Sequence, residues 1–253
     1  MTRLVLLATL GLSLATACGN GGGSPDAQQA DAREPADAAI DAAPDAFVRC
    51  PGGVLFTGEY LDWDSSDAVF QGIFEATITD SSTNATAQTA PNGRWELCVP
   101  AATTVVATIT HPDRVPVRYV AAPEVIAAGM VSTRGLTIQQ YLDLHSDAGI
   151  NVVGNTAVVL IEVRSHPSLQ PVEGATIEIG GVDPEHRFSV DAAWELQTGT
   201  ATGASGYMFF ANVTLGAGIN VATVTPPVGT TCVGPAQFPV AAGEISAVSF
   251  ACD

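Results

Sequence analysis

The chain contains no lysine. Its nine basic residues are all arginines and face 26 acidic residues in a total of 253, so the formal net charge is −17 at neutral pH. A charge this one-sided repels phosphate backbones and anionic lipid surfaces, which argues against a nucleic-acid partner. We interpret the acidity as a source of solubility through self-repulsion, with cation binding as the alternative.

Motifs that identify enzymes and metal sites are also missing. No Cys-x-x-Cys occurs, no two of the four histidines have a metal-ligand spacing, and Tyr207 replaces the last glycine of the one near match to Gly-x-Ser-x-Gly. We therefore predict no enzyme activity, no metal and no cofactor, with the histidines on the surface or in turns. An iron site of two tyrosines and two histidines, as in intradiol dioxygenases, is permitted by residue counts alone.

No apolar run near the N-terminus is long enough to span a bilayer. Arg3 is followed by fourteen apolar or small residues up to Cys18, which is typical of a signal peptide over residues 1–17. The ending "LATAC" resembles a bacterial lipobox, although Ala15 stands where leucine is preferred. The resemblance implies cleavage before Cys18 and attachment of acyl chains such as palmitate, which together anchor a protein stably. Ordinary secretion without a lipid is the alternative.

Residues 18–49 lack the apolar side chains that a core needs. Five Asp-Ala dipeptides and three prolines precede the first aromatic residue, Phe47. We predict a disordered tether that averages roughly 30 Å from end to end. Such Ala/Asp/Pro-rich tracts behind a cysteine resemble those of myxobacterial lipoproteins. This implies a lipid-anchored protein of the cell envelope, at the outer membrane, bound to the membrane through Cys18.

From Cys50 onward the pattern is typical of β-structure. Short runs rich in Val, Thr, Ile and Ala alternate with Gly, Pro, Asn and Asp. In the segment 89–112 we predict a turn at "PNGR", a strand with Trp95, Leu97 and Val99 on one face, a turn at 101–103 and a return strand over 104–110. A weaker copy of this pattern spans residues 202–227. Each copy has an Ala-Thr-Ile upstream, and the second carries about fourteen extra residues, placed within 181–199.

The order of these elements resembles the carboxypeptidase regulatory-like domain, a small transthyretin-like β-sandwich. The resemblance is good over 74–112 and weaker in the second copy, which lacks the turn asparagine and the closing proline. It implies an all-β fold of two tandem transthyretin-like or immunoglobulin-like sandwiches, over 50–136 and 151–253. A linker at 137–150, "TIQQYLDLHSDAGI", has the apolar spacing of a short helix.

Four cysteines follow the tether, and an exported chain with an even count favours disulfides. Three connectivities are possible. Because the repeat separates an early pair from a late pair, we predict that Cys50 bonds to Cys98 and that Cys232 bonds to Cys252.

Two loops are the candidate binding sites, because loops carry function on sandwich scaffolds. The first, "DWDSSD", faintly resembles a calcium loop but lacks the required glycine and glutamate, so a solvated loop is the default interpretation. The second is the extra segment 181–199, which we expect to be dispensable for folding. The candidate residues are Asp62, Asp64, Asp67, Asp183, Glu185, His186 and Trp194.

The predicted function is a non-enzymatic, lipid-anchored envelope protein that presents two β-sandwiches for adhesion, scaffolding or binding of an unknown envelope protein or glycan. Carbohydrate binding is the alternative, and it would be favoured by exposed, coplanar rings of Trp63 or Trp194. A metal-dependent, dioxygenase-like enzyme is the remaining alternative.

Overall fold

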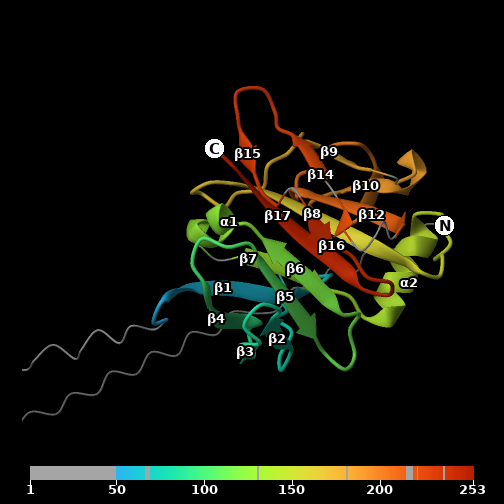
Figure 1. Ribbon diagram of the computed structural model, residues 1–253. Helices are drawn as coiled ribbons and strands as arrows, with labels where there is room; N and C mark the ends of the chain where they lie inside the picture. The colour runs from blue at the N-terminus through green and yellow to red at the C-terminus, as the bar shows by residue number, and fades with distance from the viewer. Residues whose placement is uncertain are drawn as a thin grey trace, which may run out of the picture. The chain divides into compact units, whose positions relative to one another are not determined.

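The computed structural model describes residues 50–253, except for residues 66–68, 130, 181, 215–218, 221 and 236. The predicted signal peptide, lipidated Cys18 and tether therefore lie outside the described residues. The described residues form one compact unit, which is mostly β-structure with sheets packed face to face as in a sandwich (Figure 1). Neither α-helix in the described part of the chain is long and apolar enough to cross a membrane.

Among the described residues, seven strands and one helix come from the first half of the unit, and ten strands, the helix α2 and a 3-10 turn come from the remainder. In the first half these are β1 (Gly53–Asp62), β2 (Thr77–Asp80), β3 (Thr86–Gln88), β4 (Arg94–Pro100), β5 (Val105–Thr110), β6 (Val117–Ala121), α1 (Pro123–Ala128) and β7 (Val131–Gly135). They are followed by α2 (Ile138–Asp147), β8 (Thr156–Ser165), β9 (Thr176–Ile179), η1 (Pro184–His186), β10 (Arg187–Val190), β11 (Leu196–Thr198), β12 (Tyr207–Thr214), β13 (Ile219–Asn220), β14 (Ala222–Thr225), β15 (Cys232–Val233), β16 (Phe238–Pro239) and β17 (Ile245–Cys252).

The predicted turn–strand–turn–strand unit is confirmed. Gly93 takes a positive φ of 76° in the turn, where an L side chain would be strained. Along β4, Trp95, Leu97 and Val99 are buried, whereas Arg94 and Glu96 are exposed. The strand pairs antiparallel with β1. The apolar alternation thus fixes which face of β4 enters the core.

A long sheet joins the two halves of the chain. Its strand order is β11-β10-β12-β8-β17-β6-β5-β2-β3, and the red β17 of Figure 1 lies between β8 and β6, parallel to both. The three-stranded sheet β4-β1-β7 and the pairs β14-β9 and β13-β16 are separate. The two halves of the chain therefore share a sheet. Their division into two domains by a linker at 137–150 stays a prediction.

Two hydrophobic clusters lie on opposite faces of the long sheet. On β12, Tyr207 and Phe209 belong to the cluster that contains the β1–β4 side chains, whereas Met208 and Phe210 belong to the cluster that contains Ile177 of β9. A strand covered on both faces has no polar face, which explains why the second copy is apolar at successive positions where the first alternates.

The segment predicted as a linker forms α2. Thr137 and Gln140 make a capping box, in which each side-chain oxygen accepts a hydrogen bond from the other residue's backbone N–H and so satisfies the first free N–H groups. Of the four residues that gave the helical spacing, His145 is buried and Tyr141 is half-buried, whereas Ile138 and Leu142 are exposed.

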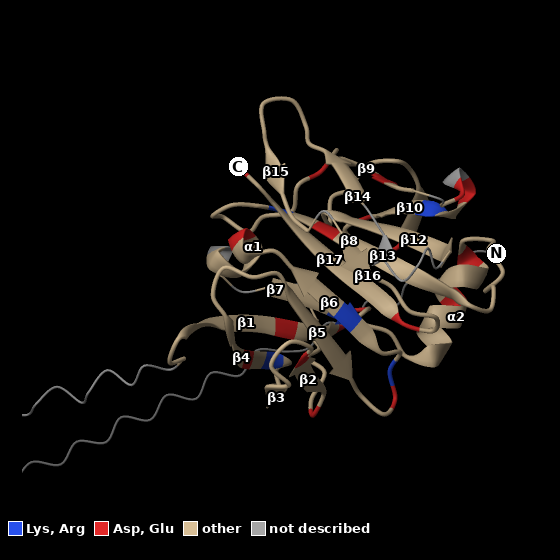
Figure 2. Ribbon diagram, in the orientation of Figure 1, with Lys and Arg blue, Asp and Glu red and all other residues tan. Residues whose placement is uncertain are grey.

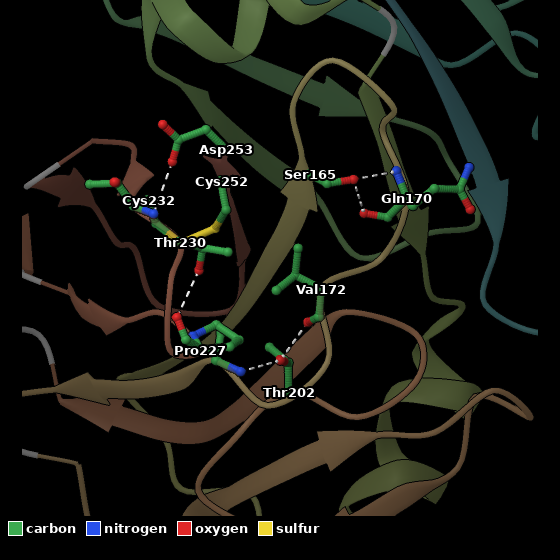
Figure 3. The surroundings of a disulfide bond; sticks show 11 residues. Ser165, Gln170, Val172, Thr202, Pro227, Thr230, Cys232, Cys252 and Asp253 are labelled. Carbon is green, nitrogen blue, oxygen red and sulfur yellow. Dashed lines mark hydrogen bonds between the residues drawn. A yellow bond between two sulfur atoms is a disulfide. The ribbon is translucent and has the colours of Figure 1, made fainter.

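Both predicted disulfides are confirmed. Cys50 bonds to Cys98, and Cys232 bonds to Cys252 with a Cα–Cα distance of 4.0 Å. The second bond joins directly opposed residues of β15 and β17 near the C-terminus (Figure 3). There, the Asp253 carboxylate accepts a hydrogen bond from the Thr231 N–H at 2.9 Å.

Candidate functional site

The two predicted binding loops lie against each other through Trp63 and Trp194, which are 131 residues apart in sequence. The Trp63 Nε1–H donates a hydrogen bond of 3.1 Å to the backbone oxygen of Trp194. The two rings are 5.5 Å apart between centroids, with their planes at 75°. Trp63 also stacks edge-on to Phe209 of β12. The edge-to-face contact between Trp63 and Trp194 joins the end of β1 to the turn between β10 and β11.

A groove of about 550 Å³ opens beside this contact, and we call it the tryptophan groove. Both loops and α2 line it, and each of these segments contributes exposed acidic residues, which are Asp64, Asp143, Asp147 and Glu195. Figure 2 shows acidic residues on α2 and few basic residues on the fold as a whole. The full lining is Trp63, Asp64, Gln140, Asp143, Leu144, Asp147, Ala193, Trp194, Glu195 and Leu196.

The first loop is held by polar contacts to Asp62. Its carboxylate pairs with Arg114 at 2.5 Å and accepts hydrogen bonds from the Asp64 N–H at 3.1 Å and the Gln140 side chain at 3.0 Å. Burial of Asp62 acts to raise its pKa, but these hydrogen bonds and the Arg114 charge outweigh it and hold the pKa below the usual 3.8. Gln140 also donates to the Asp64 carboxylate, which ties the loop to α2.

The second loop is held by Arg134. Its guanidinium lies 3.7 Å from the centroid of the Trp194 ring, and its Nη1 donates to the backbone oxygens of Asp62 and Ser65. Trp194 itself takes a positive φ of 64°, a conformation that costs energy for a residue with a side chain. The strained turn and the stacked cation together fix the Trp194 ring at the groove.

The extra segment 181–199 was expected to be a dispensable loop, and the loop interpretation is wrong because β10 and β11 lie within it. Strand β10 pairs with β12 on one side and β11 on the other, so the segment extends the long sheet. Both Phe188 and Val190 are buried in the core. Removal of the segment would uncover one edge of β12 and the side chains beneath it.

The remaining candidates do not reach the tryptophan groove. Asp183 caps the short turn η1 through a 3.0 Å hydrogen bond from the Glu185 N–H. Glu185 and His186 line a different, polar depression beside residues 148–153. Asp67 lies outside the described residues. In the described ranges no group of three or more His, Cys, Asp or Glu residues is placed to hold a metal.

The prediction that the histidines lie on the surface or in turns is wrong for His145. His145 is 1% exposed, its Nδ1 lies 2.8 Å from the Tyr141 oxygen, and its Nε2 has no hydrogen-bond partner among the described residues. Burial lowers its pKa below the usual 6.5. The ring packs on Tyr141 and Phe209, so it works as a core side chain.

Sequence reasoning missed the contribution of α2 to the groove. Asp143 and Asp147 are four residues apart, a spacing that places both carboxylates on one helix face. The capping box Thr137–Gln140 was a second usable signal, because it marks a helix start. Neither signal could indicate that this face lies beside Trp194.

No protein-family model matches the chain, and no curated protein matches it. Among solved structures, the shaft pilin SpaA from Lactobacillus rhamnosus GG is 12% identical over 79% of this chain and 98% of that one, with a TM-score of 0.26. The minor pilin GBS52 of Streptococcus agalactiae is 9% identical over 78% and 94%, with a TM-score of 0.28. At these TM-scores neither likeness carries an argument about function.

Proposed function

We propose that this chain is a non-enzymatic, lipid-anchored protein of the cell envelope whose β-sandwich unit binds an envelope partner through the tryptophan groove. The single observation that carries the binding role is the Trp63–Trp194 hydrogen bond. It joins the two loops beside one cleft, which α2 also lines, and clefts lined by convergent polar groups and aromatic rings are the usual binding sites of such scaffolds.

Export is supported by the cysteines. Disulfides persist in oxidising compartments outside the cytoplasm, and all four cysteines of the described unit are bonded in pairs. The signal-peptide pattern and the lipobox-like "LATAC" add an anchor at Cys18, and the tether places the folded unit at a distance from the membrane. Replacement of Cys18 by alanine should move the protein out of the membrane fraction or leave it unprocessed.

The chemistry of the groove favours a partner with basic side chains. Asp143, Asp147 and Glu195 present negative charge, and complementary charge speeds association and selects partners. A glycan is the alternative partner of the same groove. The tryptophan rings argue against a glycan. Trp63 is 3% exposed, and the planes of the Trp63 and Trp194 rings meet at 75°, so the two rings form no flat surface on which a sugar ring could stack.

Photo-crosslinking in the cells that make the protein tests the proposal. A photoreactive amino acid at position 147 or 195 should give the same crosslinked product, and one at Thr86 or Glu178, which are exposed on β3 and β9, should not. With the photoreactive amino acid at position 195, the double variant Asp143→Asn/Asp147→Asn should reduce the yield, whereas the matched exposed pair Glu173→Gln/Glu178→Gln should leave it unchanged. Equal products from groove and control positions would overturn the groove assignment.

A further inference from the structure

A second cavity lies apart from the tryptophan groove. It has a volume of about 160 Å³, is partly open to solvent, and is lined by residues of α1, β7, β8, β17 and the loop after β8. Its walls are mainly apolar and come from Val125, Val131, Leu169, Phe250 and Ala251. An apolar cavity of about 150 Å³ is large enough to hold a molecule of the size of benzene.

One wall carries a buried carboxylate. Glu162 is 4% exposed and lines the cavity. Its Oε1 accepts hydrogen bonds from Arg164 Nε at 2.7 Å and from the Tyr207 hydroxyl at 2.5 Å, and its Oε2 accepts one from Ser249 Oγ at 2.9 Å. A carboxylate has about four acceptor positions, so these three bonds leave one position for a further donor.

The donors of this network are fixed in their protonation. Burial, followed by the charge of Glu162, raises the pKa of Tyr207, so its hydroxyl stays protonated and donates. Tyr119 shares a 2.5 Å hydrogen bond with Ser249, and this orders the hydroxyl that faces Glu162. These hydrogen bonds therefore hold the Glu162 carboxylate in one orientation as an acceptor.

Charge balance limits what the cavity can take. Glu162 is already paired with Arg164, so the wall has no net charge to offset the desolvation of a cationic or anionic ligand. A neutral hydroxyl group can donate to the remaining acceptor position without bringing a charge out of water. An apolar body would fill the space lined by the valine, leucine and phenylalanine side chains.

We propose that this cavity is a binding site for small neutral molecules that carry one hydroxyl group on an apolar body, of the size and polarity of a phenol. The hydroxyl donates to Glu162, and the apolar body lies between α1 and β17. This site is separate from the proposed partner groove and does not depend on it.

Methyl NMR of the disulfide-bonded protein tests the site with defined probes. p-Cresol should shift the methyl signals of Val125, Val131 and Leu169, with a dissociation constant of about 1 mM or tighter. Toluene lacks the donor and should bind at least tenfold more weakly, and benzylammonium and benzoate should bind no better than toluene. Nuclear Overhauser contacts from the p-cresol methyl to Val131 or Leu169 would locate the probe directly.

The variant Leu169→Trp fills the cavity from a half-buried position on the loop after β8, and it should abolish p-cresol binding. Leu142→Trp, on the exposed face of α2, is the matched control and should bind p-cresol as the native protein does. The proposal is overturned by the absence of methyl shifts with any probe, which would leave only water in the cavity, by equal binding of toluene and p-cresol, or by contacts elsewhere. The contacts in the native protein decide the question even if Leu169→Trp misfolds.

Discussion

Removal of each disulfide should destabilise the folded unit by an amount set mainly by the loop that it closes. Cys50 and Cys98 are separated by 48 residues, and Cys232 and Cys252 by 20. The chain-entropy relation gives about 4 kcal/mol for the longer loop and about 3 kcal/mol for the shorter one at 25 °C. Most of each value comes from the freedom that the unfolded chain regains once the bond is absent.

Packing modifies the comparison. Cys252 is 1% exposed and belongs to a hydrophobic cluster, so its replacement also removes buried contacts and should bring the second cost closer to the first. The variants Cys50→Ala/Cys98→Ala and Cys232→Ala/Cys252→Ala, unfolded in urea and followed by tryptophan fluorescence, give the two free energies. Thr103→Ala, at an exposed turn, is the control. A cost below about 1 kcal/mol for either pair would refute the reasoning, since it would mean that the unfolded chain gains little freedom.

Three further substitutions have defined outcomes. Trp194→Ala should lower the free energy of unfolding by about 2–4 kcal/mol, because the ring contacts Trp63 and Arg134, and urea unfolding measures it. Asp62 has a lowered pKa, so its contribution to the free energy of unfolding is present above pH 3.8 and is lost as the pH falls through the folded-state pKa. Asp62→Asn should therefore reduce the loss of stability in acid, and an unchanged acid profile would contradict this. The buried His145 also has a lowered pKa, so stability should fall as the pH drops below 6.5, and His145→Phe should remove that fall in thermal unfolding at pH 7.5 and 5.0.

The local parts of the fold were predictable from the sequence because local chemistry determines them. The turn at Gly93 needs a positive φ, and the alternation from Trp95 to Val99 can bury only one face of β4. The disulfide pairs followed from the repeat. These signals act over a few residues or between copies of one pattern, so they do not depend on how the sheets are joined.

The joining of the halves was not predictable in the same way. Nothing in the sequence of β6 or β17 indicates that these strands pair in parallel, because an apolar strand buried on both faces fits any neighbour. The same holds for the site. Asp64 and Trp194 were identified as candidates from their loops, but their proximity depends on Arg134 and α2, which carried no binding signal.

Intact-mass spectrometry of the mature protein from the membrane fraction tests most directly the proposal that the protein is lipid-anchored at Cys18 and carries two disulfides. The predicted mass is that of a chain that begins at Cys18, carries acyl chains at that residue and lacks four hydrogens because of its two disulfides. A soluble mature chain without acyl groups, or one that has lost Cys18, would contradict the lipid anchor.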